Sequence, residues 1–492
     1  MGQSPHRGRV LALVAALLGW LFDGMEMGLF PLVARSALGE LLGPTAGEAA
    51  VANWFATVTA AFLIGAATGG VLFGWLGDKL GRVRAMTLSV LLYSLSSGLG
   101  ALADAPWQLA ALRFVGALGM GGEWALGVAL VMEVWPNANR AVLAGLIGAA
   151  GNLGYVLCGA VALGLNHAGQ RVADTLLSLG VPPGATTALT AGGYWRLLLL
   201  LGTLPAVLTL GIRLFVPESD KWQRSSRTAG NWGRLDLLGV LGGAVAAGGV
   251  VALWAVPDVP VPVRVVGTVV GLVLVTAGYL LPARQYLRRS GLSAPARRHV
   301  LGRMLLAAGL SGVPLLGTWV AVMWQYQWVG KLPGGDHPDA RPLTQIWSAC
   351  GAAAGCFLAA LLAGRFGRRP TYAALCVASG LTVVGFYRWN TAYGDAFLLS
   401  AGLMGFVAAS FYGWLPLYLP ELFPTAVRAT GQGFGFNFGR VLAAVGNLLM
   451  PGLLLSFDND YAKACAVVPL VYVAGLAVIW LAPETRGQPL PE

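Results

Sequence analysis

The stretch that decides the fold reads Gly74-Trp75-Leu76-Gly77-Asp78-Lys79-Leu80-Gly81-Arg82-Val83-Arg84. It lies between two apolar runs, residues 51–73 and 85–103. Each run is long enough to cross a bilayer as a helix, because a span needs about 20 apolar residues. A tight loop rich in lysine and arginine between two such helices indicates a cytoplasmic turn. In that turn Asp78 is placed to cap the next helix or to meet an arginine from another helix end.

The composition indicates a polytopic α-helical membrane protein. Of the 492 residues, 57% are hydrophobic and 11% are charged, whereas soluble domains carry roughly 25% charged residues. The 70 glycines fit helices that pack closely in lipid. A formal charge of +11 would also suit a nucleic-acid-binding protein. However, the basic residues fall in short loops on one predicted side, which is the positive-inside pattern, so we expect a lipid bilayer and no nucleic acid as partner.

Enzymatic and metal chemistry find no support in the sequence. The five cysteines lie singly within apolar runs, so neither a disulfide framework nor a metal site is predicted. A nucleotide-binding loop and a nucleophile constellation are both missing, so we expect no cofactor and no enzyme. The apolar run after Arg9 is too long for a cleaved signal and is predicted to be a retained first span.

We expect fourteen membrane spans, with both termini cytoplasmic and the chain a monomer in the inner cell membrane. The segment 166–193 is expected to be a long outside loop with a Pro-Pro-Gly turn at 182–184. The expected spans are residues 10–33, 51–73, 85–103, 107–134, 141–165, 194–216, 235–256, 262–282, 302–328, 345–363, 370–388, 396–419, 430–455 and 464–482.

The chain repeats itself. Glu133 and Arg140 match Glu421 and Arg428 at an offset of 288 residues, and Gly81-Arg82 matches Gly367-Arg368 at an offset of 286. Secondary transporters are often built from such repeats. We therefore expect a six-helix bundle over residues 1–216 and a second one over 300–492. The region 217–299 then contributes a cytoplasmic loop and two extra central helices.

Several motifs resemble known transporters. The opening stretch resembles the loop between the second and third helices of the major facilitator superfamily. Gly19–Glu26 and Gly119–Trp124 resemble bacterial sialate:proton symporters, a family with two additional central helices. Tyr418–Pro424 and Pro483–Gly487 are more similar to the sugar-porter and metabolite:proton symporter branches. The resemblance implies the major facilitator fold and alternating access.

Ionisable residues within the first and fourth spans are candidates for proton coupling. An ionisable residue inside a span costs about 3 kcal/mol, so it needs a partner or a purpose. Asp23 and Glu26 lie on one face of the first helix, and Glu26 and Arg113 lie at matched depths. In sugar:proton symporters an acid and an arginine on these two helices form the coupling pair. The alternative is a permanent ion pair that only fixes helix packing.

A second set of residues is predicted near the midplane, where such carriers bind substrate. Glu123 and Arg440 fall near the middle of their spans, and the repeat aligns Arg440 with Asn152. The alternative is that Glu123 and Arg440 neutralise each other. The further candidates for substrate binding are Trp319, Gln325, Tyr412 and Asn437, although an interfacial aromatic belt explains many such residues without a ligand.

Six charged residues at the inner helix ends are expected to form a cytoplasmic gate, with helix capping as the simpler alternative. They are Asp78, Arg82, Glu133, Arg140, Glu421 and Arg428.

Together these features predict a secondary active transporter for a small organic anion, an acidic sugar or a carboxylate, moved by proton symport. A neutral-sugar:proton symporter and an efflux antiporter of the same fold are the alternatives. A transporter-like sensor is a further alternative from another class, but it would need a sizeable cytoplasmic domain.

Overall fold

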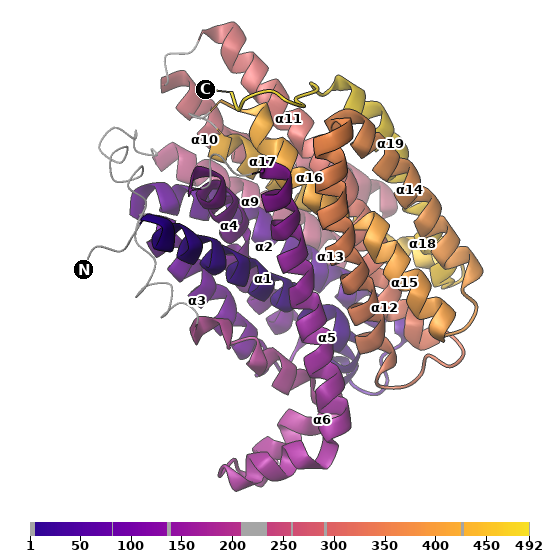
Figure 1. Cartoon of the computed structure of the whole chain (residues 1–492). Coiled ribbons are helices and arrows are strands. Elements are labelled where there is room, and N and C mark those ends of the chain that lie inside the picture. The colour runs from indigo at the N-terminus through magenta and orange to yellow at the C-terminus, as the bar shows by residue number, and fades with distance from the viewer. Residues whose placement is uncertain are drawn as a thin grey trace.

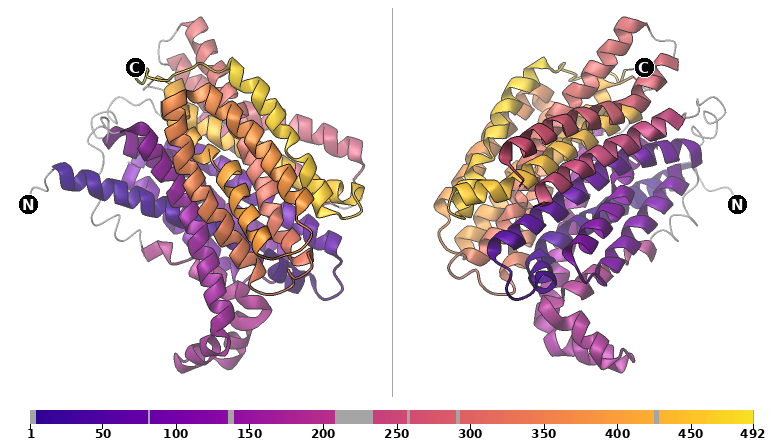
Figure 2. Two further views of the ribbon diagram at one scale, coloured as in Figure 1. Left: turned by 45° about the vertical axis from the view of Figure 1, so that its right-hand side comes forward. Right: turned by 180° about the vertical axis from the view of Figure 1, so that it is seen from behind.

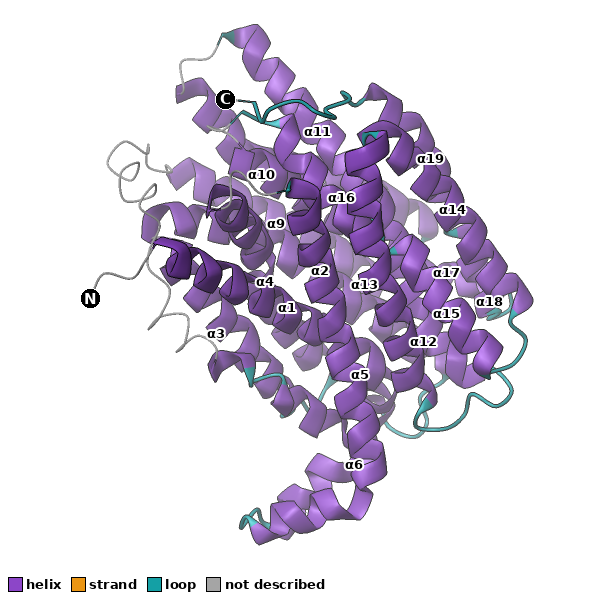
Figure 3. Ribbon diagram, viewed as in Figure 1, coloured by secondary structure: helices purple, strands orange, loops and turns teal. Residues whose placement is uncertain are grey.

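The computed structural model describes residues 5–80, 82–134, 139–207, 234–256, 259–289, 293–424 and 428–491. Within these ranges the elements are helices joined by turns and loops (Figure 3). The N-terminal half contains α1 (Pro5–Leu42), α2 (Glu48–Leu80), α3 (Arg82–Gly100), α4 (Pro106–Val134), α5 (Arg140–Ser178) and α6 (Pro183–Leu201).

The rest of the described chain begins with the central pair α9 (Arg234–Ala255) and α10 (Val261–Arg289). The C-terminal half contains α11 (Ala294–Leu316), α12 (Met323–Trp328), α13 (Ala340–Phe366), α14 (Arg368–Trp389), α15 (Asp395–Ala408), α16 (Phe411–Tyr418), α17 (Arg428–Ser456), α18 (Tyr461–Val467) and α19 (Leu470–Val478).

Eleven helices in the described ranges are long and apolar enough to cross a membrane. This confirms an all-α polytopic membrane protein, whereas the count of fourteen spans and the boundaries at 216 and 299 stay predictions. Two further expected spans lie in α3 and α4. The remaining one, 194–216, extends beyond the described residues.

The two halves pack against each other along two seams. At one seam α5 runs along α13, and at the other α2 runs along α17. The central pair α9 and α10 packs against α2 and α17, so it covers the second seam from the lipid side (Figure 2, right). The hydroxyls of Thr68 on α2 and Tyr279 on α10 are 2.5 Å apart and fasten this contact.

The segment expected as an outside loop, 166–193, is mostly helical. α5 bends at Gly169 (φ 35°) and continues to Ser178, and α6 starts at Pro183. The Pro-Pro-Gly sequence thus begins a helix, because a proline fits the first helical turn, where its missing N–H has no partner to lose. The resulting helical hairpin projects beyond the bundle, away from both termini (Figure 1). We refer to the two ends of the bundle as the hairpin end and the terminus end.

Glycines let α1 and α5 cross in close contact. A Cβ at Gly24 would lie 1.8 Å from the carbonyl oxygen of Gly151, and one at Gly154 would lie 1.9 Å from that of Leu21. This approach brings Asp23 of α1 and Asn152 of α5 to the same level of the bundle, where both line a cavity.

Candidate functional site

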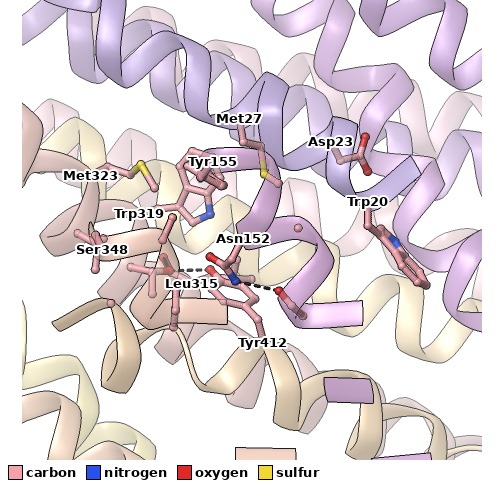
Figure 4. Close-up of a pocket in the computed structure, with 18 of the residues that line it drawn as sticks. Trp20, Asp23, Met27, Asn152, Tyr155, Leu315, Trp319, Met323, Ser348 and Tyr412 are labelled. Carbon is pink, nitrogen blue, oxygen red and sulfur yellow. Dashed lines mark hydrogen bonds between the residues drawn. The ribbon is translucent and has the colours of Figure 1, made fainter. Parts of the chain in front are cut away.

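A cavity of about 130 Å³ lies between the two halves. For comparison, an engineered apolar cavity of about 150 Å³ holds a benzene molecule. Figure 4 shows Asp23 and Trp20 on one side of it and Met323 and Ser348 on the other. The lining residues are Trp20, Asp23, Met27, Met120, Ile147, Gly148, Gly151, Asn152, Tyr155, Leu315, Thr318, Trp319, Val322, Met323, Tyr326, Ser348, Ala349, Ala352, Gly405, Ala409, Tyr412, Phe436 and Arg440.

One wall of the cavity is formed by a rare π-helical turn, Gly317–Val322, between α11 and α12. Pro314 precedes it and has no N–H, so the carbonyl of Leu310 loses its usual helical donor. The Tyr372 hydroxyl donates to that carbonyl at 2.8 Å instead. Single π turns in α-helices are frequent at functional sites, and this one carries Thr318 and Trp319 into the cavity wall.

Few polar groups interrupt the aromatic and aliphatic walls. The Thr318 and Tyr412 hydroxyls are 2.6 Å apart. The Asn152 amide donates to the carbonyl of Gly148 at 2.9 Å, one turn earlier on α5. A small number of fixed polar groups in an apolar cleft is typical of a small-molecule site.

Arg440 is the basic side chain among the lining residues. It is 5% exposed, and its Nη1 donates to Asn437 Oδ1 at 3.1 Å. Its guanidinium also lies 5.0 Å from the centre of the Phe436 ring. Among the described residues no carboxylate lies within ion-pair distance of it, and Asp23 is its acidic neighbour. The site therefore holds a cation whose nearest fixed partner is a neutral amide.

Asp23 and Glu123 lie together at the edge of this cavity. Asp23 is part of the wall, and Glu123, from α4, contacts its carboxyl group from behind. Their exposed fractions are 4% and 2%. The structure thus pairs Glu123 with Asp23 and places Arg440 beside Asp23.

Glu26 and Arg113 form a separate buried pair towards the hairpin end. Arg113 Nη1 donates to Glu26 Oε1 at 2.6 Å, and both side chains are 4% exposed. The guanidinium lies 4.6 Å from the centre of the Phe62 ring, which in turn lies 5.6 Å from that of Trp319. Arg113 also lines a small void whose wall shares Met27, Trp319 and Met323 with that of the cavity.

Four of the predicted substrate residues line the cavity, namely Asn152, Trp319, Tyr412 and Arg440. Gln325, Asn437 and Glu123 lie behind the wall. Gln325 donates a hydrogen bond to Ser348 at 3.3 Å, and Asn437 accepts one from Arg440. The sequence reading missed Tyr155, Tyr326, Thr318 and Ser348, although Tyr155 follows Asn152 at helical spacing.

At the terminus end Glu421 is the centre of a polar cluster. Arg368 donates to its two oxygens at 2.9 and 2.7 Å, and Arg140, from the other half, lies 3.1 Å away. Thr485 donates to it at 2.6 Å. Arg428 donates to backbone carbonyls, among them that of Pro420 at 3.2 Å. Arg368 and Thr485 were missed because their contacts join distant segments.

The side chains of three predicted gate residues, Asp78, Arg82 and Glu133, lie outside the described part of the structure.

The segment after α19 caps a helix at this end. Glu484 accepts hydrogen bonds at 3.0 Å from the backbone N–H groups of Arg368 and Arg369, which start α14. Burial alone would raise the pKa of Glu484, but these N–H groups and those of Thr485 and Arg486 outweigh it and lower the pKa below its usual value.

The halves also touch at the hairpin end. Lys331 lies 2.8 Å from Glu48, and Asn166 donates to Asp339 at 3.1 Å. Polar contacts between the halves therefore exist on both sides of the cavity.

Comparisons with known proteins agree with this architecture. The family model for the sugar (and other) transporter matches residues 11–230 and 336–492. A putative metabolite transport protein of Haemophilus influenzae is 25% identical over 97% of this chain and 97% of its own. The cis,cis-muconate transport protein of Acinetobacter baylyi is 26% identical over 88% of this chain and 85% of its own.

Among solved structures, the proton:xylose symporter XylE bound to 6-bromo-6-deoxy-D-glucose has a TM-score of 0.67. It is 19% identical and covers 99% of this chain and 98% of its own, so it shares the fold. The family match covers more than half of the chain. The chain therefore belongs to the sugar (and other) transporter family of the major facilitator superfamily, and it is a membrane transporter, not an enzyme.

Proposed function

We propose that this transporter carries a small carboxylate with an aromatic or unsaturated body, in symport with a proton. The observation that carries the proposal is Arg440, a buried guanidinium in the cavity wall with no carboxylate at ion-pair distance among the described residues. A guanidinium presents a planar fork that binds a carboxylate through two parallel hydrogen bonds. A substrate carboxylate would supply the counter-charge.

The walls favour a flat and largely apolar substrate body. Trp319, Tyr155, Tyr326 and Phe436 contribute aromatic faces to the cavity. An acidic sugar would need hydrogen-bond partners for many hydroxyl groups, because each unpaired polar group in an apolar site costs about 1–3 kcal/mol. The cavity offers few such partners. The muconate carrier, whose name gives an unsaturated dicarboxylate, supports the same choice.

Asp23, Glu26 and Arg113 are proposed to handle the proton. The buried carboxyl groups of Asp23 and Glu26 lie within one turn of each other on α1, and Asp23 lines the cavity between the halves. A buried acid next to a cation stays ionised and gains a proton more readily once the cation moves. Rocking of the halves would provide that movement. In a proton symporter an outside-acid gradient drives uptake, and we propose that both termini lie in the cytoplasm.

The test is uptake into proteoliposomes of the purified protein, with and without an outside-acid pH gradient. The labelled compounds are benzoate, nicotinate, cis,cis-muconate, sialic acid, glucose and xylose. We expect at least one planar carboxylate to accumulate under the gradient, and we expect Arg440→Ala to abolish this uptake. Accumulation of a neutral sugar that is unchanged in Arg440→Ala would overturn the proposal.

A further inference from the structure

The contact between Asp23 and Glu123 is unusual because it joins two acids. Both oxygens of Glu123 and Oδ1 of Asp23 have no hydrogen-bond donor among the described residues. The two carboxyl groups nevertheless lie close enough to hydrogen-bond to each other. A hydrogen bond between two carboxyl groups requires one of them to carry a proton.

The backbone of α1 is shaped to admit Glu123. A Cβ at Gly19 would lie 2.0 Å from Glu123 Oε1, so a side chain larger than glycine would push the glutamate away. Gly19 precedes Asp23 by one helical turn, so both face the same side of α1. Glycine at this position brings the two carboxyl groups together.

The ionisable groups that face the pair are Glu26 on α1, Tyr93 on α3 and Arg440 on α17. Arg113 on α4 faces Glu26, and Tyr155 on α5 and Tyr412 on α16 face Arg440. Arg113 is already paired with Glu26 at 2.6 Å. Arg440 is then the cation that remains to balance Asp23 and Glu123.

We propose, building on the proposed function, that Asp23 and Glu123 share one proton and that this acid pair competes with the substrate carboxylate for Arg440. Two carboxylates in contact within an apolar site cannot both stay ionised without a large cost. Without the proton, the doubly charged pair holds Arg440. With the proton, taken from the outer solution and released inside, the pair loses its hold and Arg440 binds the substrate.

This assignment gives Glu123 a role in the proton site and places that site at the cavity wall. Neither Glu26 nor Arg113 is among the residues that line the cavity, although Arg113 lines a small void that shares Trp319 with the cavity wall. Protonation of the acid pair therefore acts directly on Arg440, whereas protonation of Glu26 would act on Arg113.

The first test needs no substrate. Infrared difference spectra of the purified protein, recorded during a pH titration, detect the protonated carboxyl band. A shared proton predicts that Asp23→Asn and Glu123→Gln each remove the same titration step, whereas Glu26→Gln keeps it. If Glu123→Gln retains the step that Asp23→Asn removes, the proton is not shared and the inference is wrong.

The second test separates position from charge. Gly19→Ala keeps both acids but displaces Glu123, and Gly39→Ala on the same helix is the matched control because its Cβ meets no atom within 4 Å. We expect Gly19→Ala to alter the titration step. We also expect it to lose gradient-driven accumulation of the carboxylate that the uptake test identifies. Gly39→Ala should match the wild type. Equal behaviour of the two variants would contradict the inference.

The two proposals fail in different ways. If the shared titration step is found but no carboxylate is transported, the proposed substrate class is wrong and the acid pair stands. If a carboxylate accumulates normally in Glu123→Gln under a pH gradient, symport stands and the acid pair does not carry the proton.

Discussion

Arg113 and Glu26 form an ion pair at 2.6 Å deep in the N-terminal half, with both side chains 4% exposed. Glu26 Oε2 is buried without a hydrogen bond of ordinary geometry among the described residues, and the Ser97 hydroxyl is a polar neighbour of this carboxyl group. One oxygen is therefore satisfied by the cation and the other can accept a proton. The pair is arranged for a change of protonation when Arg113 moves.

We predict that Glu26→Gln abolishes accumulation against a gradient but leaves substrate exchange largely intact. Exchange needs only the loaded carrier to reorient, whereas accumulation needs protonation that is linked to that step. Counterflow and gradient-driven uptake in proteoliposomes measure the two activities. Glu40→Gln is the matched control, because Glu40 lies on the same helix as Glu26 and pairs with Arg196 of α6, but its side chain is 38% exposed. A Glu26→Gln carrier that still concentrates substrate would assign Glu26 to helix packing.

Replacing Arg440 should reduce substrate affinity in two steps. Lysine keeps the charge but loses the planar fork, so one charge-assisted hydrogen bond worth at least about 1.5 kcal/mol is lost and binding weakens by at least about tenfold. Arg440→Ala should remove specific binding. Substrate-induced thermal shifts of purified protein measure both effects. Normal binding by Arg440→Ala, together with a folding defect rescued by Glu123→Gln, would make Arg440 a structural residue.

Two tyrosines test whether the cavity wall and its support have separate roles. Tyr412 lines the cavity and its hydroxyl contacts Thr318 at 2.6 Å, so Tyr412→Phe should raise the Km by roughly fivefold, equivalent to about 1 kcal/mol. Tyr372 does not line the cavity, and its hydroxyl donates a hydrogen bond to the carbonyl of Leu310. Tyr372→Phe should instead lower the melting temperature and leave the Km unchanged. The reverse pattern would mean that the π turn, not the hydroxyl of Tyr412, fixes affinity.

Single cysteines test the topology of the central pair. In a cysteine-free background, a cysteine at Ser293 should be shielded from an outside-only thiol reagent, because it follows α10 at the terminus end. A cysteine at Pro260, in the turn between α9 and α10, should be labelled from outside. The opposite labelling pattern would mean that the C-terminal half has the reverse orientation in the membrane.

Glu484 predicts an acid-sensitive contribution to stability. Its pKa is lowered in the folded protein, so its contribution is present above the unfolded pKa and is lost as the pH falls through the folded pKa. A carboxylate at a helix N-terminus contributes roughly 1 kcal/mol at most when exposed. We expect Glu484→Gln to lower the melting temperature at pH 7 and to lower it by less at pH 3. An equal loss at both values would contradict the capping role.

The fold followed from local features of the sequence, but the site followed only in part. Apolar runs and the repeat predicted the helices and the two halves, because a span in lipid must satisfy its own backbone. Matched depth also predicted the contact between Glu26 and Arg113. The prediction of a loop at 166–193 was wrong, because a segment of mixed polarity with a Pro-Pro-Gly sequence is typical of a loop.

The contacts between neighbouring helices could not be predicted from the sequence. Helix rotation and crossing decide which residues face the cavity, and spacing along one helix does not fix either of them. Glu123 was therefore grouped with Arg440 at the midplane, with a direct pair as the alternative, whereas the close approach permitted by Gly19 puts it against Asp23. Serine and threonine side chains such as Ser348 gave no signal of their own.

Five of the buried acidic and basic side chains in the described bundle, those at and beside the cavity, carry an odd total charge. Asp23, Glu26 and Glu123 face only two cations, Arg113 and Arg440, so the unprotonated core has one excess negative charge. A carrier that takes up one proton with each monoanion keeps the same total charge when loaded and when empty. A membrane potential of 100 mV, worth about 2.3 kcal/mol per elementary charge, then neither drives nor opposes the cycle. For such a substrate, the pH difference alone supplies the energy for uptake.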